Sequence, residues 1–254
     1  MKKSLIIVSL IILSSILIPV NPLYSTKTND SLINQDMINT NIEISSLVYD
    51  LNSKPSNISY ADWTEKWWQW TYSIPWNKNP SYDNTGEYCD ENQHGPVWFL
   101  TLAYEHAVER DCNIPQNTAL LITLLNSECS YAEFPELTTE KQLRECAKNM
   151  QDIVTGAEAY LNNITIPDVI KYRIQTDLFN FTLPQDNILN LTAQTTQAIA
   201  DGNWLFLKPL PPGKYELKVK GEIDSNLSAN QTGGDEYNGP IGWNQTTIYD
   251  LMVN

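Results

Sequence analysis

The 254-residue chain contains 30 acidic and 16 basic residues, which gives a formal net charge of −14. Such an acidic balance argues against nucleic acid as a partner, because phosphate backbones are repelled, and it leaves cations and cation-bearing surfaces open. Eight tryptophans and an apolar content of 42% are enough for a substantial core, and the length fits one domain with a tail.

The first 25 residues follow the pattern of a secretory signal peptide. Lys2 and Lys3 form a positive start, an apolar run extends from Leu5 to Val20, and Ser25 offers a small residue for cleavage. The alternative is an uncleaved N-terminal anchor, although the run is shorter than the roughly 20 residues of a spanning helix. Both interpretations predict a secreted or surface-attached protein, with no span after the signal. Cleavage would change the formal charge from −14 to −16, because it removes two lysines.

Residues 26–57 are rich in Asn, Ser, Thr and Ile and show no sustained helical period. This composition predicts a flexible linker or stalk that allows one short strand near residues 42–51. The remaining residues, 58–254, are expected to form a single disulfide-bonded domain.

The first element of that domain is predicted to be a helix. Asp62 followed by Glu65 matches a capping box, and Ile74-Pro75 ends the run. One helical stripe collects five apolar residues: Tyr60, Trp63, Trp67, Trp70 and Ile74. Trp68 and Tyr72 fall on the opposite side, so the helix is either clamped between two layers or shows one face to a partner.

Burial in the core is the simpler interpretation of these aromatic side chains. Exposed Trp and Tyr rings, however, suit the apolar faces of sugar rings. The hypothetical ligand-binding residues are therefore Trp68, Tyr72, Trp76 and Trp243.

Two strands and a second helix are expected next. Val97–Ala103 and Ala119–Leu125 are apolar runs of strand length, and Thr139–Val154 carries apolar residues at helical spacing.

Beyond Glu158 the short apolar runs favour β-structure, with runs at Val169–Ile174 and Phe179–Leu183. The clearest strand alternates Tyr215, Leu217 and Val219 with charged residues, and a last strand is expected at Thr247–Val253. The turn before Tyr215 resembles the tyrosine corner of immunoglobulin-like sandwiches. The fold is therefore predicted to be mainly β: a β-sandwich, immunoglobulin-like or jelly-roll-like, with two helical insertions.

Four cysteines, Cys89, Cys112, Cys129 and Cys146, predict two disulfides in an oxidising compartment. Three pairings are possible. The sequential one, Cys89–Cys112 with Cys129–Cys146, is favoured because it closes two short loops. A zinc site is the alternative, but neither C-x-x-C nor a zinc-type Cys-His spacing occurs.

Eight asparagines begin N-x-S/T sequons, which predicts an exported glycoprotein with these positions on exposed loops and edges. They are Asn29, Asn57, Asn163, Asn180, Asn190, Asn226, Asn230 and Asn244.

An acidic stretch follows the first helix. Asp83, Glu87 and Asp90 could hold Ca²⁺ through carboxylate oxygens, although they lack the ligand order of an EF-hand and a solvated acidic loop is the simpler interpretation. No other cofactor is expected. His94 and His106 are the only histidines, and G-x-S-x-G is absent, so no hydrolytic triad is indicated.

Several ordered blocks occur between residues 60 and 254: WTEKWWQW from Trp63, NPSYDNTGEYC from Asn79, QHGPVWFL from Gln93, RDCNIP from Arg110, and DGNW with PLPPG from Asp201. Together they resemble an uncharacterised family of secreted proteins from soil and marine prokaryotes. The resemblance implies export, one continuous domain and a Cys89–Cys112 link, and it implies no activity.

Three functions are consistent with these features. The first is a secreted or cell-surface glycoprotein that binds or builds glycan or cell-envelope polymer. The second is a polysaccharide hydrolase that uses Asp83 and Glu87 as its acid pair. The third is a self-assembling surface subunit in which segment 26–57 adds a strand to a neighbour.

Overall fold

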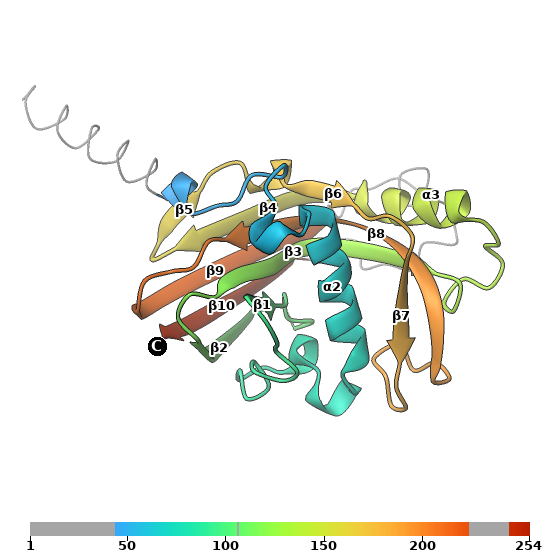
Figure 1. Cartoon of the computed structure of the whole chain (residues 1–254), viewed down its shortest axis with the longest axis horizontal. Coiled ribbons are helices and arrows are strands. Elements are labelled where there is room, and N and C mark those ends of the chain that lie inside the picture. Colours follow the sequence, from blue (N-terminus) through green and yellow to red (C-terminus); the bar gives the residue numbers. More distant parts are fainter. Residues whose placement is uncertain (1–43, 106, 224–243) are drawn as a thin grey trace, which may run out of the picture. The chain divides into compact units, whose positions relative to one another are not determined.

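The computed structural model describes residues 44–105, 107–223 and 244–254. Two sheets of five strands each pack against one another, which confirms the predicted β-sandwich with helical insertions (Figure 1). The predicted signal peptide and most of the predicted linker lie outside the described residues. Within the described ranges, none of the helices is both long and apolar enough to cross a membrane.

The first sheet has the strand order β1-β3-β8-β6, and β7 also pairs with β8. All its pairings are antiparallel except β1 with β3. Its strands are β1 (Val97–Leu100), β3 (Ala119–Ser130), β6 (Arg173–Gln175), β7 (Phe179–Leu183) and β8 (Gln194–Leu207).

The second sheet has the order β2-β10-β9-β4-β5, with β2 and β10 parallel and the others antiparallel. Its strands are β2 (Ala107–Ile114), β4 (Val154–Leu161), β5 (Ile164–Ile166), β9 (Gly213–Ile223) and β10 (Asn244–Val253).

In β9 and β10 of the second sheet, every other side chain points into the core between the two sheets. Leu217 and Val219 of β9 are buried as predicted, and so are Tyr249, Leu251 and Val253 of β10. The Tyr215 hydroxyl donates a hydrogen bond to the Pro211 carbonyl at 2.9 Å, the backbone contact that characterises a tyrosine corner.

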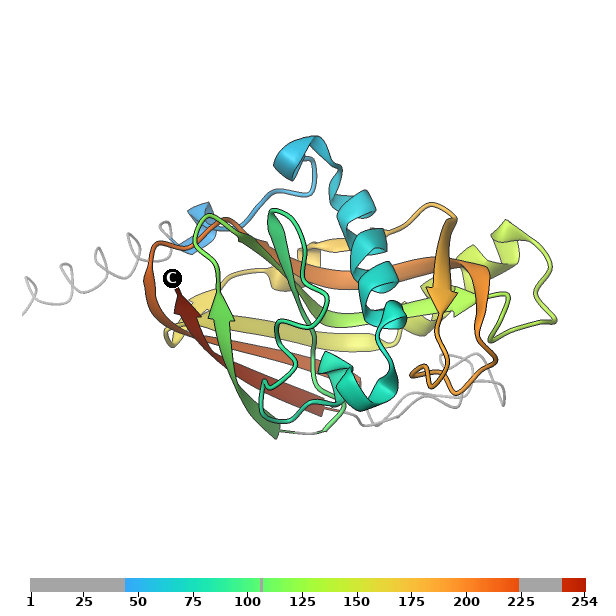
Figure 2. The same cartoon turned by 60° about the horizontal axis from the view of Figure 1, so that its bottom comes forward.

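Helix α2 (Tyr60–Ser73) adds a third layer on the outer face of the first sheet (Figure 2). Its N-cap is Ser59, which closes a capping box with Asp62, so the predicted cap at Asp62 was wrong by one turn. Ser59 suits the cap because its hydroxyl accepts from the backbone N–H of Asp62 at 3.1 Å. Both aromatic stripes of the helix are buried, and the helix is clamped rather than bare on one side.

Helix α3 (Glu140–Gln151) covers the far end of β3 and β8. The Cys129–Cys146 disulfide ties it to β3, and Cys89–Cys112 ties the loop after α2 to β2, so the favoured pairing is confirmed. The described chain also contains four short 3₁₀ turns: η1 (Pro55–Asn57), η2 (Trp76–Lys78), η3 (Pro80–Tyr82) and η4 (Val169–Lys171).

Several segments differ from the prediction. Strand β2 was not predicted, because the buried Arg110 interrupts its apolar alternation. The run Val169–Ile174 divides into η4 and the start of β6 instead of forming one strand. Residues 44–57 join the domain before residue 58, since Ile44 and Val48 are buried and Val48 bridges to β8.

Candidate ligand-binding site

A cavity of about 530 Å³ opens between α2, the middle of β3 and the C-terminal end of α3. Its size lies within the range of small-molecule sites. We call it the central cavity. Its lining combines apolar and aromatic side chains (Trp67, Trp68, Tyr72, Leu102, Ala103, Tyr104, Leu125, Met150, Val154, Ile188, Leu189, Ile223) with polar ones (Thr71, Ser81, Thr123, Asn126, Ser127, Glu128, Glu133, Gln151, Gln245).

A β-bulge in β3 turns the polar side chains of this strand into the cavity. The register with β8 shifts between Thr123 and Leu125, so Leu124 and Leu125 both join the core between the sheets. Before the bulge, odd-numbered side chains such as Leu121 pack on the α2 side. After the bulge an even-numbered one, Glu128, contacts that helix. The bulge therefore gathers polar groups from both sides of the shift beneath α2.

Most of the buried polar side-chain atoms that lack a hydrogen-bond partner within the described chain belong to residues that line this cavity. They are Trp68 Nε1, Thr71 Oγ1, Thr123 Oγ1, Asn126 Nδ2, Glu128 Oε2 and Gln245 Nε2. A buried polar group without a partner costs about 1–3 kcal/mol, so such a group in a native structure calls for a ligand, a water molecule or a function. Six such atoms belong to residues around one hollow, so this region is the candidate for a polar ligand site.

Glu128 and Glu133 form a carboxyl pair at this site, which we call the acid pair. Glu128 is 6% exposed, and its Oε1 accepts a hydrogen bond from the Tyr72 hydroxyl at 2.7 Å. Burial raises the pKa of Glu128 well above its ordinary value, and repulsion from the neighbouring Glu133 carboxyl raises it further. Glu133 is in turn held by the Ser130 hydroxyl at 2.7 Å.

This raised pKa predicts how stability depends on pH. The protonated form of Glu128 is favoured by folding, so its contribution is complete below the pKa of an unfolded glutamate and is lost as pH rises through the folded pKa. We expect Glu128→Gln to flatten this decline, because Gln keeps an acceptor for Tyr72 and carries no charge. Urea unfolding between pH 4 and 8 measures the effect, with Glu145→Gln on the exposed face of α3 as control. A decline as steep in Glu128→Gln as in the wild type would contradict the assignment.

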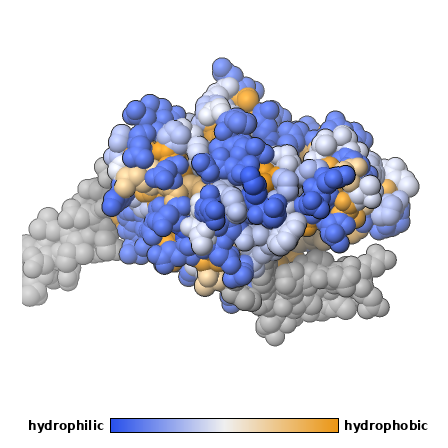
Figure 3. All heavy atoms as spheres, turned by 90° about the horizontal axis from the view of Figure 1, so that it is seen from below, coloured by the Kyte–Doolittle hydropathy of each residue, from blue (hydrophilic) through white to orange (hydrophobic). Residues whose placement is uncertain are grey.

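Three exposed aromatic residues lie beside the cavity, and we call them the aromatic rim. Trp76, Tyr82 and Tyr104 are 56%, 42% and 52% exposed. Tyr82 stacks on Tyr104 with ring centroids 4.5 Å apart, Trp76 meets Tyr82 edge-on at 6.3 Å, and Tyr104 itself lines the cavity. In Figure 3 the visible face is mostly hydrophilic, with apolar residues in separate small areas. Among the described residues, the rim includes three of the four exposed large hydrophobic side chains.

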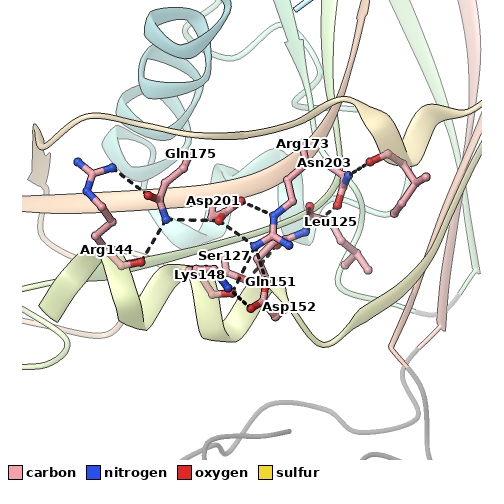
Figure 4. A network of polar contacts seen from close by, with 11 residues as sticks. Leu125, Ser127, Arg144, Lys148, Gln151, Asp152, Arg173, Gln175, Asp201 and Asn203 are labelled. Carbon is pink, nitrogen blue, oxygen red and sulfur yellow. Dashed lines mark hydrogen bonds and ion pairs between the residues drawn. The ribbon is translucent and has the colours of Figure 1, made fainter. Parts of the chain in front are cut away.

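A polar network behind the cavity holds its α3 wall in place (Figure 4). Arg173 donates to both oxygens of Asp201, at 2.8 and 2.9 Å, and pairs with Asp152 at 2.8 Å. Although partial burial favours the neutral acid, hydrogen bonds from Lys148 and Arg173 lower the pKa of Asp152.

The same network orients the Gln151 side chain. Its Nε2 donates to the Asn203 side chain at 2.9 Å and to the Leu125 carbonyl at 3.1 Å. The Ser127 hydroxyl donates to Gln151 at 3.3 Å. Because Gln151, Ser127 and Leu125 all line the cavity, these hydrogen bonds link its α3 wall to β3.

Of the hypothetical ligand-binding residues, Trp68 and Tyr72 lie in the cavity wall and Trp76 belongs to the rim. Trp68 and Tyr72 are largely buried in the fold and also line the central cavity. They therefore contribute to packing and to the wall that a ligand would contact. Trp243 and His106 lie outside the described residues. His94 is exposed and is not part of the cavity lining.

In the acidic stretch after α2, one carboxylate is used within its own turn and two carboxylates are exposed. Asp83 is buried, and its carboxylate accepts backbone hydrogen bonds from Thr85, Gly86 and Tyr88 at 2.8–3.0 Å, so it holds the turn. These bonds lower the pKa of Asp83 despite its burial. Glu87 and Asp90 are exposed.

Across the described ranges, no group of three or more His, Cys, Asp or Glu side chains is arranged to hold a metal ion. The calcium hypothesis for Asp83, Glu87 and Asp90 therefore finds no assembled site in this part of the chain. The physical reason is that Asp83 already uses its oxygens within its own turn.

Five sequon asparagines, Asn57, Asn163, Asn180, Asn190 and Asn244, are exposed. Asn57, Asn163 and Asn190 have positive φ and lie at turns. The exposure fits the expectation that these positions are accessible to a glycosylating enzyme. Asn29, Asn226 and Asn230 lie outside the described residues.

Sequence reasoning missed the acid pair, the polar residues of β3 and the tyrosines of the rim. The available signal was Glu128 itself, a carboxylate within the apolar run Ala119–Ser130 and next to Cys129. A charged residue in such a run is expected to be paired or functional.

Comparison with known proteins adds no identity to this geometry: no family model matches the chain, and no curated protein sequence matches it.

Proposed function

We propose that this protein is a secreted binding module whose central cavity and aromatic rim take a glycan or a related hydroxyl-rich envelope polymer. The observation that carries the proposal is the set of six unpartnered polar atoms around one aromatic-walled cavity. Hydroxyl groups of a sugar both donate and accept, so they can satisfy amide, indole, hydroxyl and carboxyl groups together.

The aromatic rim supports the same ligand class. Tyr82 and Tyr104 stack with an interplanar angle of 19° and remain largely exposed, as does Trp76. Exposed aromatic faces suit the apolar faces of sugar rings. A chain that enters the cavity at Tyr104 can therefore continue over the rim.

Export supports an extracellular ligand. Two disulfides link the described cysteines, as expected for an oxidising compartment, and the predicted leader would deliver the chain there. Asp83 is held within its turn, so the structure favours the binding function over hydrolysis by Asp83 and Glu87.

The test replaces the indole donor of the cavity without removing an existing bond. Trp68→Phe removes no hydrogen bond, but it removes part of a buried ring that packs against Trp67 and Tyr72, so it is expected to lower stability by about 1 kcal/mol. It is expected to weaken binding of oligosaccharides or cell-wall fragments by about tenfold, the worth of one buried hydrogen bond. Titration calorimetry measures the affinity and urea unfolding measures the stability.

Trp70→Phe is the matched control on the same helix. Trp70 Nε1 donates to the Glu91 carbonyl at 2.9 Å, and Trp70 does not line the cavity. This variant should lose about 1 kcal/mol of stability and keep the affinity. Equal affinity of Trp68→Phe and wild type, or no binding of any glycan class by wild type, would refute the proposed function.

A further inference from the structure

The acid pair lacks the donors that hold the other buried acids of the described chain. Asp201 is held by Arg173, and Asp83 is held by backbone N–H groups. Glu128 has one hydrogen bond to Tyr72, and its Oε2 has no protein donor. No lysine, arginine or histidine is among the described residues that line the central cavity.

Two neighbouring carboxyls in a buried site repel one another when both are ionised. The groups that face Glu128 from the surrounding elements are Tyr72 of α2, Glu133 from the loop after β3, and Tyr104 from the loop before β2. All three are neutral or acidic. A cation placed between the two glutamates would therefore supply the positive charge that no side chain of the cavity lining provides.

The aromatic side chains around the acid pair favour the same kind of ligand. Tyr72 bonds to Glu128 and packs against Trp68 with ring centroids 5.2 Å apart. Trp68 in turn meets Trp67 edge-on at 5.1 Å. Ring faces attract ammonium groups electrostatically, and more strongly where water is excluded.

We propose that the ligand of the central cavity carries a protonated primary amine that lies between Glu128 and Glu133, as in a non-acetylated amino sugar. This inference rests on the proposed function and specifies its ligand class. The amine donates hydrogen bonds to Glu128 Oε2 and Glu133, while sugar hydroxyls satisfy the amide and hydroxyl groups of the opposite wall.

Proton release accompanies such binding. In the free protein Glu128 holds a proton at moderately acidic pH, because its pKa is raised by burial and by Glu133. An incoming ammonium group favours the ionised carboxylate, so the proton leaves Glu128 for solvent as the complex forms. Affinity should rise with pH until Glu128 is ionised in the free protein, and then level off while the amine remains protonated.

The experiment compares three oligosaccharides of equal length by titration calorimetry: glucosamine, N-acetylglucosamine and glucose oligomers. We expect the amine form to bind at least tenfold more tightly than either neutral form. Between pH 5 and 7 its affinity should rise, and repetition in buffers of different ionisation enthalpy should reveal the released proton.

Glu128→Gln tests the role of the acid pair, and thermal unfolding verifies that the variant is folded. We expect the variant to lose both the preference for the amine and the proton release. Glu158→Gln is the control, because Glu158 is an exposed acid of β4 paired with Lys220 and does not line the cavity. It should bind as the wild type does.

The outcomes separate the two proposals. Equal or tighter binding of a neutral oligomer overturns the amine assignment and leaves the glycan-binding function standing. An unchanged amine preference in folded Glu128→Gln also overturns the assignment. Failure of all three oligomers and of other glycan classes to bind overturns both.

Discussion

Replacing Trp67 with alanine is expected to lower the free energy of unfolding by about 4 kcal/mol, within the usual range for a buried Trp→Ala change. The side chain is 3% exposed, and its Nε1 donates to the Leu100 carbonyl at 2.9 Å. Its ring meets those of Trp68, Trp70 and Trp204 edge-on, with centroids 5.1–6.0 Å apart. The substitution removes the indole that joins α2 to the first sheet.

Urea unfolding under non-reducing conditions measures this loss, and Trp76→Ala supplies the control. Trp76 is 56% exposed, so its replacement should change stability by less than about 0.5 kcal/mol. If Trp67→Ala were no more destabilising than Trp76→Ala, the aromatic layer would not hold the helix on the sheet.

Replacing Arg173 with alanine is expected to lower the free energy of unfolding by about 3 kcal/mol. The Asp201 side chain is 5% exposed, and Arg173 engages both of its carboxylate oxygens. Loss of one partner of a buried pair leaves an uncompensated charge, which typically costs about 3–5 kcal/mol. The lower end applies here, because the Arg173 side chain is 33% exposed and water can reach part of the pair.

Chemical unfolding of Arg173→Ala and of the double variant Arg173→Ala/Asp201→Asn distinguishes an unpaired charge from lost packing. The double variant should regain much of the stability, because no buried charge remains. Lys220→Ala, which removes a surface partner of Glu158, should cost about 0.5 kcal/mol or less. A double variant no more stable than Arg173→Ala would assign the loss to packing alone.

Local patterns along the chain were sufficient for much of the architecture. The alternation of apolar and polar residues identified Leu217, Val219 and the inward residues of β10, because side chains of a strand with one solvent-exposed face alternate between core and solvent. The two helices, the tyrosine corner and both disulfides followed from equally local rules of periodicity, turn chemistry and loop length. By contrast, β2 escaped prediction because its inward Arg110 finds the partners of its Nη1 in Thr101 and Tyr249, 9 and 139 residues away in sequence.

The site depended on contacts that no local pattern contains. The sequence by itself determined that α2 would carry aromatics on two sides, and it thereby identified Trp68 and Tyr72. Only the tertiary structure decided that these rings border a cavity and that Glu128 lies against Tyr72, 56 residues away. The physical reason is the bulge in β3: it reverses which side chains face the helix, and that reversal depends on pairing with β8 rather than on the residues of β3 alone.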